Sequence, residues 1–250
     1  MPSPVAFVTG AGRGVGRAIA QRFARDGYAV AVVGRSHAPV AESADAILAS
    51  GGEALAVTCD VSSRDEVARA VALSEQRLGP IDVLVNNAGI AESAPFVSMD
   101  DEMWDRTLAV NLTGAYNCMR AIVPGMLERR HGRIINIAST AARTAFPYTA
   151  AYVASKHGLL GLTRAVALEA RGRGVTVNAV CPGWIDTGMT GRSIARIVEK
   201  TGRSPDDARR TLESMNPQGR LIDVEEVANV AAFLASPEAA GINGQDVDIP

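Results

Sequence analysis

Cysteine and histidine are scarce in this chain of 250 residues, which has three of each. Cys59, Cys118 and Cys181 lie far apart in apolar surroundings, without the spacing of a metal site. We therefore expect buried, reduced thiols in a reducing compartment and no metal centre. The histidines are expected to have no catalytic role. His37 and His131 are predicted in loops, and His157 on a helix, facing away from the residue before it.

An excess of charge of one sign is also missing. The formal net charge of −2 offers no electrostatic basis for binding nucleic acid or an anionic membrane. The longest apolar runs, such as Val227–Ala235, are too short to span a bilayer. The first residues lack the basic and apolar regions of a signal peptide. Because 47% of the residues are apolar, we expect one domain, residues 1–250, with a sizeable core, in a cytoplasmic protein.

Short β-rich runs alternate along the chain with longer helical runs. Several of the β-rich runs are continuous in Val, Ile and Ala, as in parallel sheets that are covered on both faces. The alternation predicts an α/β fold, a doubly wound parallel sheet of about seven strands with helices on both faces. The predicted strands are Pro4–Thr9, Ala29–Gly34, Ala54–Thr58, Val83–Asn86, Arg133–Ala138, Val175–Val180 and Asp246–Ile249.

Several helix ends carry local signals. The first helix is predicted over Gly14–Asp26, with Gly27 suited to its C-terminal end. Ser63 and Asp223 each precede a glutamate by three residues, which predicts a capping box at the start of two further helices. One long insertion, Thr187–Arg220, breaks the alternation and carries two short helical patterns. Insertions of this kind are often lids over a site, so we expect a helical lid at about residues 187–220.

A glycine-rich loop, Thr9–Gly16, connects the first strand to the first helix. Glycines permit the tight turn and let backbone N–H groups approach a pyrophosphate, and the helix N-terminus adds partial positive charge. The spacing departs from G-x-G-x-x-G, because Val15 occupies the third glycine position. A glycine-rich turn without a ligand is the alternative, but the place of the loop after the first strand favours a dinucleotide. The expected cofactor contacts are Gly10, Gly12, Arg13, Gly14, Val15 and Gly16.

The end of the second predicted strand bears on which dinucleotide binds. NAD sites place a carboxylate near this point to bind the ribose 2′-OH, but this chain has Arg35 there and no carboxylate before Glu42. Arg35 and Arg13 suit a 2′-phosphate, which guanidinium groups hold in charge-assisted pairs. We therefore expect NADP(H), the alternative being two solvated surface arginines. Asp60, after the third strand, is placed to meet the adenine edge.

Tyr152 and Lys156 lie at the start of a long apolar helix predicted over Ala151–Arg171. Positions i and i+4 share a helix face, so the two side chains point the same way. A neighbouring ammonium favours phenolate, and we expect it to lower the pKa of Tyr152 and so suit the phenol to proton transfer. Ser139 follows the strand Arg133–Ala138, where its hydroxyl can hydrogen-bond a substrate oxygen. Most Y-x-x-x-K pairs are solvated helix residues, so the pair is weak evidence by itself.

Taken together and in this order, these segments resemble the short-chain dehydrogenase/reductase family over essentially the whole chain. The matching segments are Thr9–Gly16, Asp60-Val61, Asn86-Asn87-Ala88-Gly89, Asn111, Ser139, Tyr152 with Lys156, and Pro182-Gly183 with Thr187. The resemblance implies a Rossmann-type fold. It also implies transfer of a hydride between a nicotinamide cofactor and a carbonyl or secondary alcohol.

The resemblance implies four catalytic residues. Tyr152 matches the general acid/base, and Lys156 the residue that lowers its pKa and binds the nicotinamide ribose. Ser139 matches the donor to the substrate oxygen, and Asn111 the residue that holds a water in the proton relay.

The resemblance also extends the cofactor site. Asn87, Ala88 and Gly89 match a segment that stabilises the central sheet beside the cofactor, and Ile185 and Thr187 match positions that hold the carboxamide. The Arg13 and Arg35 pattern is that of NADP-preferring members. Val110 is expected only to pack beneath the site. The remaining implied cofactor contacts are Asp60, Val61, Tyr152, Lys156, Pro182 and Gly183.

The substrate is less clearly indicated. The candidate pocket wall is mostly apolar and comprises Ile90, Ala91, Thr140, Phe146, Tyr148, Trp184 and Met189. The lid is rich in basic residues, either as solvated helix faces or as attraction for a phosphate-bearing acyl carrier. These residues are Arg192, Arg196, Lys200, Arg203, Arg209, Arg210 and Arg220.

Two subfamilies compete. The strings Arg130–Ile134 and Arg173–Asn178 resemble 3-oxoacyl-thioester reductases, in which Arg130 and Arg173 would match basic docking residues for acyl carrier protein. The string Cys181–Trp184 and the long lid resemble 3-hydroxybutyrate dehydrogenases. Those enzymes grip a free carboxylate with two glutamines, a histidine and a lysine, whereas the matching positions here are Ala91, Ala141, Thr149 and Ser193. A 3-oxoacyl thioester, on acyl carrier protein or CoA, is therefore the favoured substrate.

Other readings stay open. The enzyme could act on another secondary alcohol or ketone, such as a 3-hydroxyacyl-CoA, a cyclic ketone or a polyketide-type ketone. A different class is a non-catalytic NADP(H)-binding sensor, which the complete set Asn111, Ser139, Tyr152 and Lys156 disfavours. The family resemblance also implies a homotetramer that pairs through the helices around Asn111–Glu128 and Tyr152–Arg171.

Overall fold

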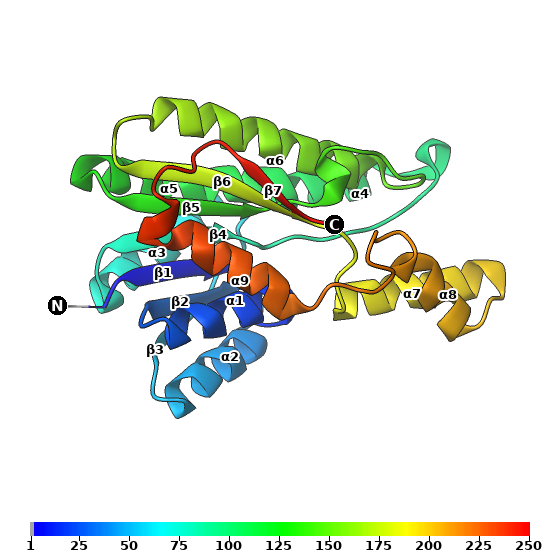
Figure 1. The fold of residues 1–250 in the computed structure, drawn as a ribbon, viewed down its shortest axis with the longest axis horizontal. Coiled ribbons are helices and arrows are strands. Elements are labelled where there is room, and N and C mark those ends of the chain that lie inside the picture. Colours follow the sequence, from blue (N-terminus) through cyan, green and yellow to red (C-terminus); the bar gives the residue numbers. More distant parts are fainter. Residues whose placement is uncertain (1–2) are drawn as a thin grey trace.

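The structure, a computed structural model, describes residues 3–250 and is built around one parallel sheet (Figure 1). Its strand order is β3-β2-β1-β4-β5-β6-β7, and every neighbouring pair runs parallel. The strands are β1 Val5–Thr9, β2 Ala29–Gly34, β3 Glu53–Thr58, β4 Ile81–Asn86, β5 Gly132–Ile137, β6 Val175–Pro182 and β7 Asp246–Ile249. The predicted doubly wound sheet of about seven strands is confirmed, with strand ends within two residues of their predicted positions.

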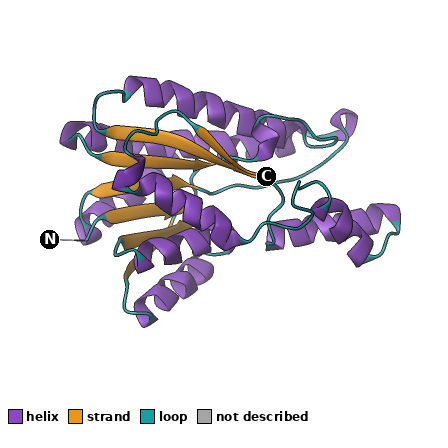
Figure 2. Ribbon diagram, in the orientation of Figure 1, coloured by secondary structure: helices purple, strands orange, loops and turns teal. Residues whose placement is uncertain are grey.

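Helices cover both faces of the sheet (Figure 2). Buried residues of α3 (Arg64–Leu78), α5 (Gly114–Arg129) and α6 (Ala150–Glu169) form one core cluster with the sheet. Buried residues of α1 (Gly14–Arg25), α2 (His37–Ala49) and α9 (Val224–Ala235) form a second cluster on the other face. Strands β1, β5 and β6 are buried along their whole length, as expected for a parallel sheet covered on both faces.

Local sequence signals place most helix ends correctly. Gly27 follows the end of α1 with φ +88°, a conformation that glycine adopts without strain. The capping box of α9 is complete, since the Asp223 side chain accepts from the helix backbone and Glu226 accepts from the Asp223 N–H at 2.9 Å.

Two local predictions need correction. Ser63 caps α3, but the Glu66 carboxylate reaches past it to the Asp60 N–H, at 2.8 Å, so only half of the predicted capping box forms. This bond braces the turn after β3. His37 is the first residue of α2 rather than a loop residue, because Ser36 takes the extended N-cap position before it.

The lid leaves the main body as α7 (Gly188–Thr201) and α8 (Pro205–Glu213), as predicted. Figure 1 shows these two helices projecting to the right of the sheet, beyond the ends of the strands. A short parallel bridge between Ile185 and Ile222 joins the two chain segments at the base of the lid. The lid therefore has a closed base although its two ends are far apart in sequence.

Candidate active site

Most of the predicted functional residues gather at one edge of the sheet, where the strands end. The glycine loop follows β1, Arg35 follows β2 and Asp60 follows β3. Asn87–Gly89 follow β4, Ser139 follows β5 and Gly183–Thr187 follow β6. Successive crossovers diverge between β1 and β4, and in open α/β sheets this divergence is where ligands bind.

The glycine loop packs so tightly that side chains are excluded at Gly10, Gly12 and Gly16, and a Cβ on Gly10 would lie 2.9 Å from Ala88 Cα. A Cβ on Gly16 would lie 2.3 Å from the Gly10 carbonyl oxygen, and one on Gly12 would lie 2.8 Å from Pro39 Cβ. Gly14 is different. Its φ is +54°, and a Cβ added to it would have Thr187 Cγ2 as its nearest neighbour, at 3.6 Å. Gly14 therefore borders space between the loop and the start of the lid, as a site for a pyrophosphate requires.

Thr9 and Asn87 join the loop to the end of β4. The Thr9 hydroxyl accepts from the N–H groups of Asn87 and Ala88, both at 3.0 Å. The Asn87 side chain donates to the carbonyls of Thr9 and Gly10 at 2.9 and 3.3 Å. This arrangement agrees with a role for Asn87 in stabilising the central sheet. The sequence predicts Thr9 as part of the loop but not this bridging role, because a threonine at a strand end does not indicate which groups its hydroxyl binds.

The two arginines of the predicted 2′-phosphate site are both exposed. Arg13 is the extended N-cap residue of α1, and Arg35 follows β2. Neither forms an ion pair with a carboxylate of residues 3–250, so both charges are free to meet an anion. Asp60 uses Oδ1 to accept from the Ser62 N–H and hydroxyl at 2.9 and 2.7 Å. Those bonds fix the carboxylate and leave Oδ2 available to a donor.

Tyr152 and Lys156 lie together in the first turns of α6, as the i, i+4 spacing predicts. Lys156 is only 5% exposed, and its Nζ donates to the Ile137 carbonyl at 2.8 Å. The same Nζ lies 5.7 Å from the centroid of the Tyr152 ring. Burial raises the pKa of the Tyr152 phenol, and a hydrogen bond from the Ser139 hydroxyl lowers it in part, which links that hydroxyl to the same centre. The end of β5 thus meets the start of α6 at three polar side chains.

The direction of the pKa shift on Tyr152 corrects the sequence-based expectation. Burial raises the pKa of the phenol above its usual value, and the bond to Ser139 offsets only part of this effect. Burial also lowers the pKa of Lys156 to about 8. At neutral pH the lysine still carries its charge, because pH 7 lies below this value, and it is bound to a backbone carbonyl. In this structure Tyr152 is a protonated phenol at neutral pH, ready to donate.

Asn111 lies in a π-helical segment, Ala109–Thr113, between α4 (Asp101–Leu108) and α5. Its side chain accepts from the Ile90 N–H at 2.8 Å and donates to the Ile90 carbonyl at 2.9 Å. It also donates to the Ser155 hydroxyl at 3.1 Å, so both amide hydrogens are used. Asn111 thus fastens the loop after β4 to α6. Single-turn π segments often mark functional sites, and helical periodicity gives no signal for one.

Gly89 provides room beside the catalytic residues. A Cβ at this position would lie 3.4 Å from Asn111 Oδ1 and 3.8 Å from Lys156 Nζ. A side chain would therefore extend into the space next to the lysine. Together with Gly14, this residue leaves the surface open where the predicted cofactor would run, so the residues present fit a dinucleotide.

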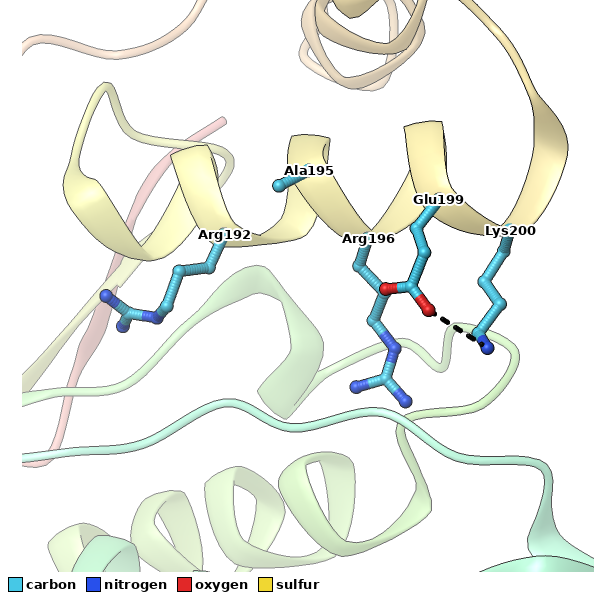
Figure 3. Close-up of a pocket in the computed structure, with 5 residues that line it drawn as sticks. All are labelled: Arg192, Ala195, Arg196, Glu199 and Lys200. Carbon is cyan, nitrogen blue, oxygen red and sulfur yellow. Dashed lines mark ion pairs between the residues drawn. The ribbon is translucent and has the colours of Figure 1, made fainter.

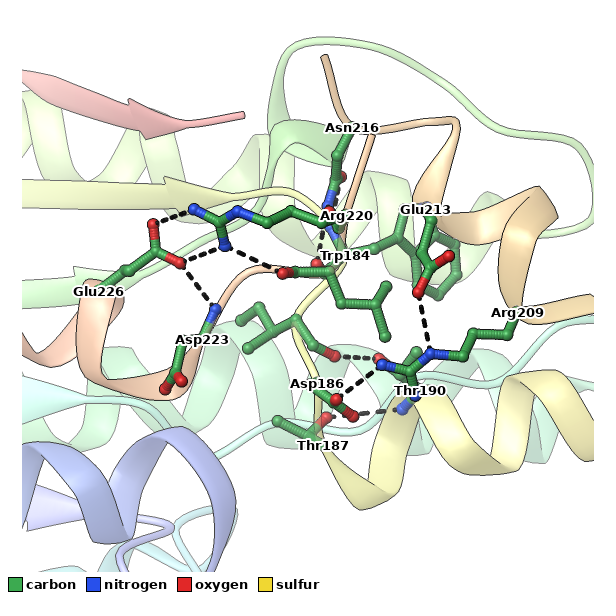
Figure 4. A network of polar contacts seen from close by, with 12 residues as sticks. Trp184, Asp186, Thr187, Thr190, Arg209, Glu213, Asn216, Arg220, Asp223 and Glu226 are labelled. Carbon is green, nitrogen blue, oxygen red and sulfur yellow. Dashed lines mark hydrogen bonds and ion pairs between the residues drawn. The ribbon is translucent and has the colours of Figure 1, made fainter. Parts of the chain in front are cut away.

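The base of the lid contains a network that was not predicted from the sequence (Figure 4). Asn216, 3% exposed, accepts from the Trp184 N–H at 2.9 Å and donates to the Trp184 and Arg220 carbonyls at 2.9 and 2.8 Å. A Cβ on Gly183 would lie 2.5 Å from Asn216 Oδ1. The signal, an asparagine before a proline, is typical of any turn. Thr187 begins α7 by accepting from the Thr190 N–H.

Arg130 and Arg173 lie at the opposite edge of the sheet from this site. They precede β5 and β6, whereas Ser139 follows β5. Arg130 also donates to the Gly172 carbonyl at 3.0 Å. A strand the length of β5 spans about 20 Å, so on one chain these arginines are remote from the catalytic edge.

The remaining predictions are met in part. The candidate pocket wall is mixed: Ile90, Thr140, Phe146, Trp184 and Met189 are partly buried, whereas Ala91 and Tyr148 are exposed. All three cysteines are free and buried. His157 is exposed and contacts the Val153 carbonyl within its own helix, so it faces away from the site. Among residues 3–250 no helix is both long and apolar enough to cross a bilayer.

The chain was also compared with known proteins. The family model described as enoyl-(acyl carrier protein) reductase matches residues 10–249. The chain is 38% identical over 248 residues to the 3-oxoacyl-[acyl-carrier-protein] reductase FabG of Staphylococcus epidermidis, covering 98% of this chain and 96% of the relative. It is 39% identical over 245 residues to the short-chain reductase protein NovJ of Streptomyces niveus, covering 98% and 92%.

A solved structure is similar throughout. A single-residue variant of the actinorhodin polyketide ketoreductase, solved with NADPH, superposes with a TM-score of 0.96 at 38% identity, covering 100% of this chain and 97% of that one. The similarity therefore includes the lid as well as the sheet. From the glycine loop to the last strand, the chain belongs to the short-chain dehydrogenase/reductase family.

Proposed function

We propose that this protein reduces the ketone of a 3-oxoacyl thioester to the 3-hydroxyacyl product, with NADPH as the hydride donor. The observation that carries the proposal is the grouping of Tyr152, Ser139 and Lys156 at the end of β5 and the start of α6. Ketone reduction needs a proton donor at the carbonyl oxygen, and the half-buried phenol of Tyr152, whose pKa burial raises, carries its proton at neutral pH.

A bound NADPH would provide the hydride for the carbonyl carbon. Residues of this chain bind and protonate the carbonyl oxygen. The Ser139 and Tyr152 hydroxyls hydrogen-bond it, and the Tyr152 O–H bond breaks as its proton moves to the oxygen that gains negative charge. Lys156, held by the Ile137 carbonyl, supports the phenolate that remains. The proton relay through Asn111 would use its main chain, because the side-chain amide hydrogens are already bonded.

The cofactor preference rests on Arg13 and Arg35. Both are exposed, without carboxylate partners among residues 3–250, and the position after β2 lacks the acid that binds a free ribose 2′-OH. The actinorhodin ketoreductase of similar fold was solved with NADPH. The glycine loop, Asp60, Asn87–Gly89 and the segment Pro182–Thr187 would hold the rest of the dinucleotide.

The substrate class rests on what the pocket lacks and on the relatives. Ala91, Ala141, Thr149 and Ser193 cannot make a charged grip on a free carboxylate, so a free 3-hydroxy acid is disfavoured. The similar proteins described above are named as a 3-oxoacyl-[acyl-carrier-protein] reductase and a polyketide ketoreductase. The description of the matching family model instead names enoyl reduction. An enoyl substrate has no carbonyl carbon at the hydride-accepting position, and Ser139 with Tyr152 matches the oxygen of a ketone.

The direct test follows NADPH absorbance with acetoacetyl-CoA, crotonyl-CoA and a panel of cyclic ketones. We expect oxidation with acetoacetyl-CoA and a loss of at least about 100-fold in kcat for Tyr152→Phe. Crotonyl-CoA turnover in place of acetoacetyl-CoA would favour an enoyl reductase. Turnover of cyclic ketones alone would indicate that the substrate is a ketone other than a 3-oxoacyl thioester. Binding of NADPH with no oxidation by any substrate would favour a sensor. Full activity of Tyr152→Phe would contradict the mechanism.

We also propose a homotetramer and a cytoplasmic location. The tetramer is supported by exposed apolar side chains on the two helices that the resemblance implicates, Tyr116 on α5 and Leu168 on α6. The location is supported by three free cysteines, since such thiols persist in a reducing compartment.

A further inference from the structure

The lid carries seven basic side chains, and three of them are paired with carboxylates of α8 and of the chain segments next to the lid. Arg209 pairs with Asp186 and Glu213, at 2.8 and 2.9 Å. Arg210 pairs with Asp207 at 2.6 Å, and Arg220 pairs with Glu226 at 2.6 Å. These residues lie on α8 and on the segment that returns to α9. The positive charges of these three arginines are therefore used in ion pairs within the protein.

The cations of α7 are different. Arg192 and Arg196 form no ion pair with a carboxylate of residues 3–250, and Lys200 meets only Glu199, its exposed neighbour, at 3.3 Å. The three residues recur every four positions, so they form one stripe along one helix face. At 1.5 Å per residue the stripe extends about 12 Å. We name it the α7 stripe.

The α7 stripe lines an open pocket of about 340 Å³ together with Ala195 and Glu199 (Figure 3). In Figure 3 both arginine side chains leave the same side of α7, Arg192 extending toward the start of the helix and Arg196 away from the helix axis. None of the lining residues is one of the predicted catalytic residues. The pocket is therefore a largely basic surface of the lid that is separate from the predicted catalytic residues.

The direction of α7 connects this surface to the active site. Its N-cap residue, Thr187, lies 3.6 Å from where a Cβ of Gly14 would be, so the helix begins at the glycine loop. From that point the stripe continues outward, with Arg192 in the second turn. The base of the lid is closed by Asn216 and by the Ile185–Ile222 bridge, which holds α7 in this direction. A long substrate that enters along α7 would pass the stripe before its reacting end reaches Tyr152.

We propose that Arg192 and Arg196, with Lys200, bind the phosphate end of the pantetheine arm of the thioester substrate. This inference rests on the proposed function, because a thioester of CoA or of acyl carrier protein carries its phosphate on that arm. The arm separates thioester and phosphate by a long flexible chain, so a phosphate site must lie away from the reacting atoms. Planar guanidinium groups pair with phosphate oxygens in two parallel bonds, which suits the two arginines.

The position of the stripe also indicates that the lid, rather than Arg130 and Arg173, contacts a substrate bound at the active site of the same protomer. Those two residues precede β5 and β6, at the far edge of the sheet. The α7 stripe projects from the edge at which Ser139 and Tyr152 lie. Three cations in a row match several phosphates better than one, which favours CoA over the single phosphodiester of a carrier protein.

The experiment compares three acetoacetyl thioesters that differ only beyond the arm: those of CoA, 4′-phosphopantetheine and pantetheine. We expect Arg192→Gln/Arg196→Gln to raise KM about tenfold for the CoA thioester. We expect values within about twofold of wild type for the pantetheine thioester, with kcat preserved for both. The matched control is Arg210→Gln, which removes the same charge from α8, and we expect it to behave as wild type. Circular dichroism and thermal melting check that the variants are folded.

The outcomes separate the two sources of phosphate. A loss confined to the CoA thioester means that the stripe binds the phosphates that CoA carries beyond the 4′-phosphate. An equal loss with 4′-phosphopantetheine means that it binds the phosphate next to the arm, which a carrier protein shares. The inference is overturned by equal effects on all three thioesters, by no effect on any, by the same loss in Arg210→Gln, or by a matching rise in KM for NADPH. Failure of the wild-type protein to reduce any of the thioesters would instead overturn the proposed function itself.

Discussion

Individual side chains at the catalytic edge combine burial with a specific polar partner. Lys156 is nearly inaccessible, yet its Nζ reaches the Ile137 carbonyl. Tyr152 is desolvated, yet it meets the Ser139 hydroxyl. Burial keeps the phenol protonated and makes the ammonium costly to keep. Such shifted groups often identify functional sites, because the fold maintains them at a cost in stability.

The cost of the buried lysine can be measured. Its pKa falls from 10.5 to about 8, so between these pH values the unfolded chain binds more protons and the free energy of unfolding rises with pH. At pH 7 the folded state bears the full penalty. We expect Lys156→Met to raise the free energy of unfolding at pH 7 by about 1 kcal/mol, after loss of the bond to Ile137, and to remove this pH dependence. Urea unfolding at pH 7 and pH 10 measures both effects.

Lys200→Met provides the control, because Lys200 is exposed on α7. Its stability should follow wild type at both pH values. Lys156→Met could instead be less stable than wild type at pH 7 and keep the wild-type pH dependence. That result would show that burial of Lys156 does not lower the free energy of unfolding.

A second effect at the scale of the residue concerns the dinucleotide. Arg35→Asp removes a cation and adds a charge that repels a 2′-phosphate but accepts from a free 2′-OH. We expect kcat/KM for NADPH to fall about 100-fold, with kcat/KM for NADH unchanged or raised. Steady-state kinetics with both cofactors measures this. Arg69→Asp, at an exposed position of α3, should leave both values near wild type. Equal losses with both cofactors would contradict the assignment of Arg35.

Among the elements of secondary structure, the lid depends most on one residue. Its two helices are far from the sheet, and its two ends are joined through Asn216 and the Ile185–Ile222 bridge. Asn216 is buried and uses its side-chain oxygen and both amide hydrogens in bonds to backbone groups. A buried backbone group that loses its partner costs about 1–3 kcal/mol. The orientation of α7, and with it the phosphate site, therefore depends on this asparagine.

Asn216→Ala should loosen the lid while leaving the sheet intact. The lid contains many arginines, so trypsin reports its opening directly. We expect cleavage within residues 192–220 to become at least about tenfold faster, because the cleavable state costs less free energy to reach. Ser214→Ala is the control, since the Ser214 hydroxyl bonds only within its own turn. Cleavage that begins equally fast in the two variants would argue against a closed base.

At the scale of the whole molecule, large apolar side chains remain on the surface. Leu168 on α6 is 65% exposed, and Tyr116 on α5 is 37% exposed. Leu48, on α2 across the sheet, is 50% exposed. Exposed apolar side chains of this size can be covered by a second subunit. The two long helices that border the catalytic edge are therefore candidates for contact between copies of this chain.

Light scattering coupled to gel filtration tests this interface. We expect a mass of about four times the 26.1 kDa of the chain for the wild-type protein. Leu168→Glu should reduce it to two chains or one, because the charge would lose its hydration in an apolar contact. Leu48→Glu should leave the mass unchanged. A wild-type protein that is monomeric at micromolar concentration, or a Leu168→Glu variant with the full mass, would contradict the proposed tetramer.

Much of the architecture could be predicted from the chain alone, because its signals are local. Continuous apolar runs marked buried strands, and glycines and capping residues marked the ends of α1 and α9. The Thr9–Gly16 loop and the Tyr152–Lys156 spacing need only neighbouring residues to be recognised. The gathering of loops at one edge also followed, since parallel strands all end on the same side of their sheet.

Other properties depended on contacts between distant segments. The raised pKa of Tyr152 arises from burial, which the i, i+4 spacing does not report. Asn111 bonds to Ile90 although α4 lies between them in the chain, and Asn216 closes a lid whose ends are more than thirty residues apart. The charge of α7 was visible in sequence, but only the tertiary structure showed which arginines already have carboxylate partners. Local patterns determine where an element begins, whereas desolvation and pairing depend on what the folded chain brings against it.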